Sequence, residues 1–325
     1  MDKKVIVIIP VYNGEKFITE ALESAINQTI KANTIVVSDN NSNDKTREIL
    51  TKIIKKYPCS NIKLYKNEVN LGYHNNLNKC LEYSKGFDYL VILYADDILK
   101  PDMIESHINF FSKYPYLGLI GSKEDMINER GVFLKTTSNG INIFYNAGNI
   151  YEYVVDTAQY IADSSIMYDR TKLDNVGIYQ TNTLFSNELF NMRVLQKYPI
   201  LIRGDSVVYR RDHKQNQLYE WAKNRRNDYI GEIKNYDKLV QFEKRPDFQN
   251  KLREYYKNRF PRMLIALGAS SIRKNFDIKG ATIYLFNAAL MKPIVVFSKP
   301  YLKSLFLIIL NALGLYRLFY NIHHK

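Results

Sequence analysis

The sequence has little cysteine and no glycine-rich phosphate loop. Its two cysteines, Cys59 and Cys80, have the spacing of neither a metal site nor a redox motif, so a reducing compartment suits the chain. Neither a G-x-G-x-x-G nor a Walker A pattern occurs in the N-terminal part. These absences argue against a dinucleotide-dependent oxidoreductase and against a P-loop ATPase.

A secretory signal and a long hydrophobic run are also missing. The N-terminal sequence MDKKVIVIIPVYNG combines two lysines with an apolar run, but the run is short and no small-residue cleavage site follows it. We interpret this run as a first strand. The apolar core near the C-terminus, Leu305 to Tyr316, is shorter than the ~20 residues that a membrane-spanning helix needs.

Charge is distributed unevenly along the 325 residues, whose 46% hydrophobic content suits one large or two modest domains. The formal net charge is +13, and from Trp221 onward 20 Lys and Arg stand against 7 Asp and Glu, so the part before Trp221 is neutral. A neutral front and a basic tail predict different partners. Anionic lipid attracts basic clusters and is one predicted partner of the basic tail. Nucleic acid, which also attracts basic clusters, is the alternative partner.

Strand and helix patterns alternate through the N-terminal third of the chain. Apolar, β-branched runs predict strands at Lys3–Ile9, Thr34–Val37, Ile62–Tyr65 and Asp88–Leu93. Helical spacing of apolar residues predicts one helix that ends near Gln28 and two others at Lys45–Tyr57 and Asn75–Tyr83. This alternation is typical of βαβ units and a parallel sheet.

Three polar loops, at Tyr12, Asp39 and Asp96, follow three of the predicted strands. In right-handed βαβ topology the carboxyl ends of parallel strands lie at one edge of the sheet, and ligands of open α/β sheets bind there. The sequence therefore predicts that a polar ligand with an anionic part binds at this edge.

Two adjacent carboxylates, Asp96 and Asp97, lie near the end of the run YLVILYADDILKP. Two negative charges at the end of a buried strand are costly unless a positive group neutralises them. A divalent cation that carries a diphosphate meets this need, because hard cations take oxygen ligands and keep positions open for phosphate. A solvated turn ahead of a helix that begins at Pro101 is the alternative interpretation.

Four motifs, in order, resemble those of the family 2 glycosyltransferases of the GT-A fold. They are V-I-I-P-V-Y-N, V-V-S-D-N-N-S-N-D-K-T, N-L-G-Y-H-N-N-L-N and Y-A-D-D. The resemblance covers about the first 110 residues in register and is weaker to about residue 217. It implies an α/β fold with a mostly parallel, Rossmann-like central sheet and flanking helices, a nucleotide-sugar donor, Mg²⁺ or Mn²⁺, and inversion at the anomeric carbon.

The resemblance also implies which residues contact the nucleotide sugar. Tyr12 stands where an aromatic ring covers the nucleobase, and Asp39 and Asn40 stand where a pair of acids reads it. Asn40 departs from the commoner Asp, but its amide oxygen can still accept a hydrogen bond. The other implied donor contacts are Pro10, Asn13, Asn70, Gly72, Asn78, Asp96, Arg210 and Arg211.

For the cation, the resemblance makes Asp97 the ligand, Asp96 a contact to the ribose and His213 a further candidate ligand. The motif is of the D-x-D type, with Ala95 at its first position. Arg210 or Arg211 is expected to neutralise the leaving diphosphate. A structural or solvated His213 is the alternative, because a lone histidine is more often one of these.

Inverting transfer needs a general base that takes the proton of the acceptor hydroxyl. The family pattern E-D-x-x-L-x-x-R, aligned on Arg193, places Asn187 rather than an acid at the usual position. The neighbouring Glu188 is therefore the predicted base, with Asp163 in reserve. The alternatives are that Glu188 only interacts favourably with the helix dipole, or that the protein is catalytically inactive.

From Leu218 onward the pattern is helical and basic, and the apolar core lies between Lys303 and Arg317. Basic flanks and aromatic residues around a short apolar core favour a helix that lies in the membrane interface. A re-entrant segment, a short span and a core helix packed on the catalytic domain are the alternatives. We expect a GT-A domain at residues 1–217 and a basic helical extension at residues 218–325, whose C-terminal segment associates with the membrane.

With these features, the resemblance implies metal-dependent, inverting transfer of a hexose-type sugar from a UDP-, dTDP- or GDP-linked donor to a lipid-linked saccharide acceptor. The resemblance alone implies bacterial O-antigen or capsule synthesis as the setting. We expect the protein to act in the cytoplasm at the inner face of the plasma membrane and without nucleic acid. The Q-x-x-R-W signature of processive synthases is absent, so transfer of one sugar or a few is expected. The rivals are a catalytically silent sugar-nucleotide-binding scaffold and a nucleotidyltransferase, which would carry a Gly-rich basic N-terminal loop.

Overall fold

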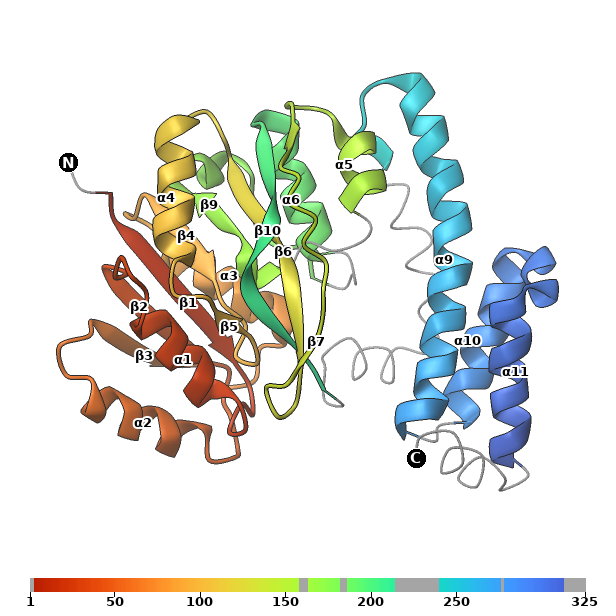
Figure 1. Ribbon diagram of the computed structural model, residues 1–325, viewed down its shortest axis with the longest axis horizontal. Helices are drawn as coiled ribbons and strands as arrows, with labels where there is room; N and C mark the ends of the chain where they lie inside the picture. Colours follow the sequence, from red (N-terminus) through yellow and green to blue (C-terminus); the bar gives the residue numbers. More distant parts are fainter. Residues whose placement is uncertain (1–2, 158–162, 182–185, 214–239, 276–277, 313–325) are drawn as a thin grey trace. The chain divides into compact units, whose positions relative to one another are not determined.

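The computed structural model describes residues 3–157, 163–181, 186–213, 240–275 and 278–312. The chain divides into two compact units, Met1–Asp212 and His213–Lys325. The first unit combines a sheet with flanking helices and the second is helical (Figure 1). The domain boundary predicted after residue 217 lies outside the described residues.

A ten-stranded sheet forms the centre of the first unit, in the order β3-β2-β1-β4-β9-β6-β10-β5, with β7 paired to β6 and β8 to β10 (Figure 1). The strands are β1 (Val5–Val11), β2 (Thr34–Asp39), β3 (Ile62–Lys66), β4 (Tyr89–Ile92), β5 (Ile98–Leu99), β6 (Leu119–Asn128), β7 (Phe133–Thr136), β8 (Ile143–Tyr145), β9 (Met167–Asp169) and β10 (Ile200–Asp212). Strands β3, β2, β1 and β4 are parallel. Because β9 is antiparallel to both β4 and β6, β6 and its parallel neighbour β10 run in the same direction as β1. This confirms the predicted mostly parallel central sheet.

Helices cover the sheet of the first unit. They are α1 (Ile18–Ile26), α2 (Thr46–Lys56), α3 (Tyr73–Tyr83), α4 (Met103–Lys113), α5 (Ile150–Thr157) and α6 (Ser186–Lys197), with the 3₁₀ helices η1 (Asp163–Ser165) and η2 (Arg170–Asn175). All seven residues of β1 are buried, as expected for a parallel strand covered on both faces. Val5, Val7 and Ile9 belong to a core shared with α1, α2 and α4, and α3 also packs against β1.

The loops predicted to carry the site leave the sheet at one edge. Val11, at the end of β1, pairs in register with Asp39, at the end of β2, and Ile8 pairs with Ile92, at the end of β4. Because these strands are parallel, the segments that follow them emerge on the same side of the sheet. The alternation of strands and helices in the sequence thus places Tyr12, Asp39 and Asp96 on neighbouring loops.

The second unit contains the helices α9 (Pro246–Asn275), α10 (Ile278–Met291) and α11 (Lys299–Ala312), with the 3₁₀ helix η3 (Pro293–Phe297) between the last two. These helices pack on one another (Figure 1). In the part of the chain that the structure describes, no helix combines the length and apolar character needed to cross a bilayer.

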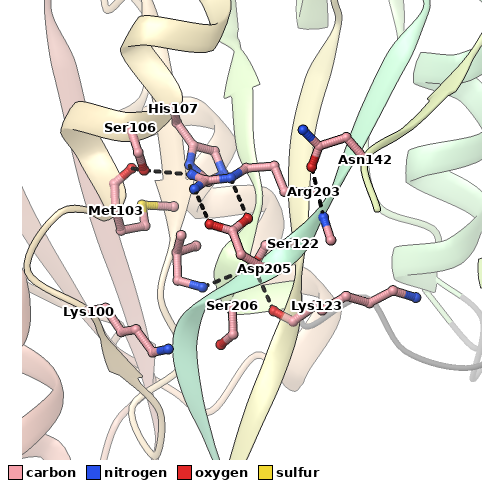
Figure 2. Close-up of polar contacts among 12 residues, drawn as sticks. Lys100, Met103, Ser106, His107, Ser122, Lys123, Asn142, Arg203, Asp205 and Ser206 are labelled. Carbon is pink, nitrogen blue, oxygen red and sulfur yellow. Dashed lines mark hydrogen bonds and ion pairs between the residues drawn. The ribbon is translucent and has the colours of Figure 1, made fainter. Parts of the chain in front are cut away.

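Gly204 lies where the 139–142 loop crosses β10. A Cβ atom at this position would lie 2.1 Å from the backbone nitrogen of Ile141, and the Gly204 N–H donates to Asn142 Oδ1 at 3.0 Å (Figure 2). We expect Gly204→Ala to lower the free energy of unfolding by about 1–3 kcal/mol, because the loop backbone has to move off the strand. Chemical denaturation measures this. Val132→Ala, at an exposed hairpin position, should change it by less than about 0.5 kcal/mol, and equal losses in the two variants would contradict the argument.

Candidate active site

The loop after β1 carries Tyr12 and Asn13 beside the end of β2. The Tyr12 ring is 45% exposed. Asn13 has a left-handed φ of 53°, donates its N–H to Ser42 Oγ (2.9 Å) and accepts a hydrogen bond from the Asn43 N–H (3.0 Å). These bonds connect the loops after β1 and β2, so the exposed aromatic ring of Tyr12 extends from a fixed backbone.

Asp39 is fully buried at the end of β2 and keeps one oxygen for a ligand. Its Oδ1 accepts a hydrogen bond from the Ser42 N–H at 2.9 Å. Its Oδ2 lies 3.1 Å from Arg47 Nε, but the two atoms are not aligned for a hydrogen bond, and this buried oxygen has no hydrogen-bond partner among the described residues. A buried acceptor without a donor is costly, so a ligand N–H would stabilise it.

Asn40 ties the end of β2 to the loop before α3. Its Oδ1 accepts hydrogen bonds from the Leu71 N–H (2.9 Å) and from Asn67 Nδ2 (3.0 Å). Its Nδ2 donates to Asn70 Oδ1 (2.8 Å), which also accepts from the Gly72 N–H (2.8 Å). The amide oxygen expected to read a nucleobase therefore already has two donors within the protein.

Two other residues predicted to contact the donor, Pro10 and Asn78, make contacts within the fold. Pro10 lies within β1, in register with Ser38. Asn78, on α3, donates to the Tyr179 carbonyl (3.0 Å) and accepts from the Tyr179 N–H (2.7 Å). This pair of bonds fixes the segment after η2 against α3, and the contacts of Pro10 and Asn78 to a donor stay predictions.

Asp97 is almost completely buried just after β4, at 4% exposure, while Asp96 is half-buried. Asp97 Oδ2 accepts a hydrogen bond from Ser164 Oγ (2.6 Å), and Oδ1 accepts one from the Arg211 N–H (3.0 Å). Burial, followed by the charge of Asp96, raises the pKa of Asp97 to about 8. Both oxygens of Asp97 are thus engaged by the protein, and Asp96 is the more accessible of the two carboxylates.

Asp163, on η1, is a half-buried carboxylate held by the first turn of α6. Asn187 Nδ2 donates to Asp163 Oδ2 (2.7 Å) and to the Tyr94 hydroxyl (2.8 Å). The pKa of Asp163 is raised to about 6: burial raises it most, the bond from Asn187 opposes this rise, and the charges of Glu188 and Glu124 contribute to it. A carboxylate of this kind exchanges a proton close to neutral pH.

Glu188, the predicted base, is half-buried in the first turn of α6, next to Asn187. Its charge acts on both Asp163 and Tyr153. The side-chain oxygen Oδ1 of the neighbouring Asn187 is buried and has no hydrogen-bond partner among the described residues. The structure therefore brings Glu188, the predicted base, and Asp163, the reserve candidate, into one cluster with Asn187.

A polar cluster around the buried side chains of Arg203 and His107 contacts η1 through the Ser165 carbonyl, and Figure 2 shows Arg203, His107 and Asp205 of this cluster. Arg203 Nη1 lies 3.2 Å from His107 Nδ1, and because a guanidinium only donates, His107 Nδ1 accepts. The imidazole proton is therefore on Nε2, which lies 3.1 Å from the Ser165 carbonyl and donates to it. Burial, and then the charge of Arg203, lower the pKa of His107 to about 3, so the ring stays neutral. Asp205 accepts from Arg203 Nε at 2.9 Å and balances its charge.

Arg210 and Arg211 lie next to each other on β10 but have different surroundings. Arg211 is buried; its Nε donates to the Asp96 carbonyl (3.1 Å) and its Nη2 to Glu20 Oε2 (2.9 Å). Arg210 donates from Nε to Glu124 Oε2 (2.8 Å), and its charge lowers the pKa of both acids, Asp97 and Asp163. Of the two arginines, Arg210 is the one near the acid cluster whose guanidinium is only partly buried.

A divalent cation fits this site only together with a phosphate ligand. Within the described ranges, no three His, Cys, Asp or Glu side chains gather into a set that would hold a metal alone. Mg²⁺ typically binds through one or two carboxylates, water and substrate phosphates, and the half-buried Asp96 provides such a carboxylate. His213, the other candidate ligand, is buried and is the first residue of the second unit.

Sequence reasoning missed several residues of the cluster. Tyr94, which bonds Asn187, appears in the sequence analysis only as part of the Y-A-D-D motif, and Ser164, which bonds Asp97, and Glu124 were not singled out. The available signal was weak: polar residues within otherwise apolar segments. Their partners are 65 or more residues away in the chain, so spacing alone does not connect them.

The chain matches the description glycosyl transferase family 2 over residues 6–190. It belongs to this family. It is 29% identical to an uncharacterised glycosyltransferase of Haemophilus influenzae over 185 residues, 56% of this chain and 54% of that protein. It is 26% identical over 180 residues, 50% of this chain and 56% of the relative, to the dolichyl N-acetyl-alpha-D-glucosaminyl phosphate 3-beta-D-2,3-diacetamido-2,3-dideoxy-beta-D-glucuronosyltransferase of Methanococcus voltae. The chain spans about half the length of the curated relatives it matches.

Two solved structures share the fold. One is S. aureus TarS in complex with UDP, with a TM-score of 0.56 and 20% identity, covering 89% of this chain and 90% of that one. The other is the mannosyltransferase PcManGT of Pyrobaculum calidifontis in complex with GDP-Man and Mn²⁺, with a TM-score of 0.59 and 17% identity, covering 97% and 87%. The predicted family and the GT-A fold are thereby confirmed.

Proposed function

We propose that this family 2 member transfers a sugar from a nucleotide donor, bound with a divalent cation, to a hydroxyl of a lipid-linked glycan precursor, with inversion. The observation that carries the proposal is the acid cluster at the sheet edge. It combines two half-buried carboxylates, Asp96 and Asp163, with the arginine Arg210, and the pKa of Asp163 is raised to about 6. A cation site, a base and a charge that stabilises a leaving diphosphate are what this reaction needs.

The nucleobase is proposed to bind between Tyr12 and Asp39. The exposed ring of Tyr12 offers a face for stacking, and the buried Asp39 Oδ2, which has no hydrogen-bond partner among the described residues, accepts a base N–H. The complexes of TarS with UDP and of PcManGT with GDP-Man support a nucleotide donor. Asn40 is proposed to hold the loop before α3 rather than to read the base, because both its oxygen and its nitrogen are engaged.

The cation is proposed to bind at Asp96 rather than at Asp97, because both Asp97 oxygens already accept hydrogen bonds from the protein. When bound, the cation supplies Lewis-acid stabilisation of the departing diphosphate. Arg210 is proposed to add a second positive charge there, whereas Arg211 holds the backbone of Asp96 in place. Mn²⁺ in the PcManGT complex supports a divalent ion.

Asp163 is proposed to be the base, and Glu188 to modulate it. Asn187 fixes the Asp163 carboxylate by donating from Nδ2 to Asp163 Oδ2. The acceptor hydroxyl would donate to Asp163, which takes its proton as the oxygen attacks the anomeric carbon. Glu188 raises the pKa of Asp163 by its charge.

The acceptor is proposed to be lipid-linked and the enzyme to act at the cytoplasmic face of the plasma membrane. The basic second unit, with large apolar side chains exposed on η3 and α11, supports membrane association, and the dolichyl phosphate sugar named for the M. voltae relative supports a lipid-linked acceptor. O-antigen, capsule or a similar surface polysaccharide is the proposed setting.

A panel of UDP-, dTDP- and GDP-sugars with Mn²⁺ tests the function. We expect one donor to raise the melting temperature of the full chain, with a stabilisation of about 2.7 kcal/mol at a concentration 100 times its Kd. The same donor should be hydrolysed slowly to the nucleoside diphosphate. Binding with neither hydrolysis nor transfer would favour a silent scaffold, and stabilisation by a nucleoside triphosphate alone would favour a nucleotidyltransferase.

A further inference from the structure

The second unit has its own groove, bounded by α9, η3 and α11. Its volume is about 730 Å³. Polar residues lining it are Asn258, Arg262, Lys292, Ser298, Lys303 and Ser304. Buried apolar side chains of Ile265, Val295 and Leu307 also line it. The groove therefore combines an apolar wall with charged and hydroxyl groups.

The groove is cationic. Arg262, Lys292 and Lys303 come from three different segments, and the described residues that line the groove include no carboxylate. Lys292 Nζ donates to Asn258 Oδ1, which fixes one cation against α9. The sequence has no Asp or Glu after Asp277, so η3 and α11 contribute no negative charge. Three cations and two serine hydroxyls that line one groove favour an anion with several oxygens, such as a phosphate.

Large apolar side chains are exposed on the two elements that border the groove. They are Ile294 and Phe297 of η3, and Leu302, Leu305, Phe306 and Ile309 of α11. Phe297 is 79% exposed, and Ile294 both lines the groove and is 67% exposed. Exposed apolar groups gathered on neighbouring elements mark an interaction site. A nucleic acid offers phosphates but no layer for these side chains, whereas a lipid offers both.

We propose that this groove binds the phosphate headgroup of an anionic membrane lipid, with the phosphate against Arg262, Lys292 and Lys303 and the apolar residues of η3 and α11 in the acyl layer. The inference rests on the membrane association proposed above and adds a defined lipid site to it. The site is separate from the acid cluster, because every residue that lines the groove belongs to the second unit.

Vesicle flotation of the full chain tests the site, using phosphatidylcholine vesicles with and without phosphatidic acid. The groove variant is Arg262→Gln with Lys303→Gln. The matched control is Lys257→Gln with Lys299→Gln, which removes two exposed positive charges of the same unit that do not line the groove. We expect the groove variant to lose about tenfold more binding to the anionic vesicles than the control, because general attraction to the surface falls equally in both.

Each of the other outcomes would contradict one part of the proposal. Equal losses of vesicle binding in the two variants would show that binding depends on a diffuse basic surface, and would contradict the groove site. Thermal stabilisation of the wild type by inorganic phosphate, lost in the groove variant while flotation is unchanged, would make it a site for free phosphate. A DNA mobility shift lost in the groove variant, with flotation unchanged, would make it a nucleic-acid site. No flotation of the wild type at all would refute the membrane association itself. Unchanged far-UV circular dichroism of both variants shows that the helices of the second unit are folded.

Discussion

Asp163→Asn is expected to lower kcat about 10³-fold while leaving donor binding nearly unchanged, because a positioned general base contributes about 10²–10⁴. The substitution keeps an oxygen that accepts the hydrogen bond from Asn187 Nδ2, so the geometry of η1 and α6 should persist. Only the capacity to take the proton is lost. Steady-state kinetics with a saturating donor measure kcat, and donor-induced thermal shift measures binding.

Glu188→Gln is the matched control, since Glu188 lies in the same cluster and was the base predicted from the sequence. Asp163 must be ionised to accept a proton, so kcat/KM of the wild type should fall as the pH decreases through about 6. Removing the Glu188 charge, which raises the pKa of Asp163, should move this acid limb to lower pH with only a small loss of rate. A loss of 10³-fold in Glu188→Gln, with a nearly active Asp163→Asn, would make Glu188 the base.

The strands that carry the site could be predicted from the sequence because each is a buried apolar run. β1 and β4 are buried along their whole length, and the polar residues that follow them mark the sheet edge. The antiparallel β9 between β4 and β6 was not predicted as such, since three residues are too short a pattern to give a direction. Its neighbour η1 carries Asp163, so the place of the acid became evident only from the sheet order.

The sequence did not show which of two adjacent polar residues faces the ligand. At Asp96–Asp97, Asn187–Glu188 and Arg210–Arg211 the motif indicates the segment, but which of two neighbours turns toward the ligand depends on distant partners. Arg211 is held by Glu20, and Asp97 by Ser164. In a strand a shift of one residue exchanges the two faces, so at Arg210–Arg211 on β10 an error of one position exchanges a structural role with a functional one.

Asp96→Asn is expected to abolish Mn²⁺-dependent donor binding and to lower kcat/KM at least about 100-fold, or about 3 kcal/mol. Asp96 is the half-buried member of the acid pair, whereas Asp97 is 4% exposed. A neutral amide at position 96 removes the carboxylate that holds the cation beside the diphosphate. Titration of Mn²⁺ in the presence of the nucleoside diphosphate, followed by electron paramagnetic resonance of the free ion, measures binding directly.

Asp97→Asn separates the two assignments of the cation. An asparagine at this position retains an oxygen for the Arg211 N–H and turns its amide toward Ser164 Oγ, so the bonds that hold the turn after β4 can persist with the Ser164 proton redirected. We therefore expect Asp97→Asn to bind Mn²⁺ with the nucleoside diphosphate much as the wild type does. If Asp97 is the ligand, as the motif alone predicts, Asp97→Asn loses Mn²⁺ binding and Asp96→Asn retains it. That result would mean that a carboxylate with both oxygens engaged by the protein still supplies a lone pair to the ion.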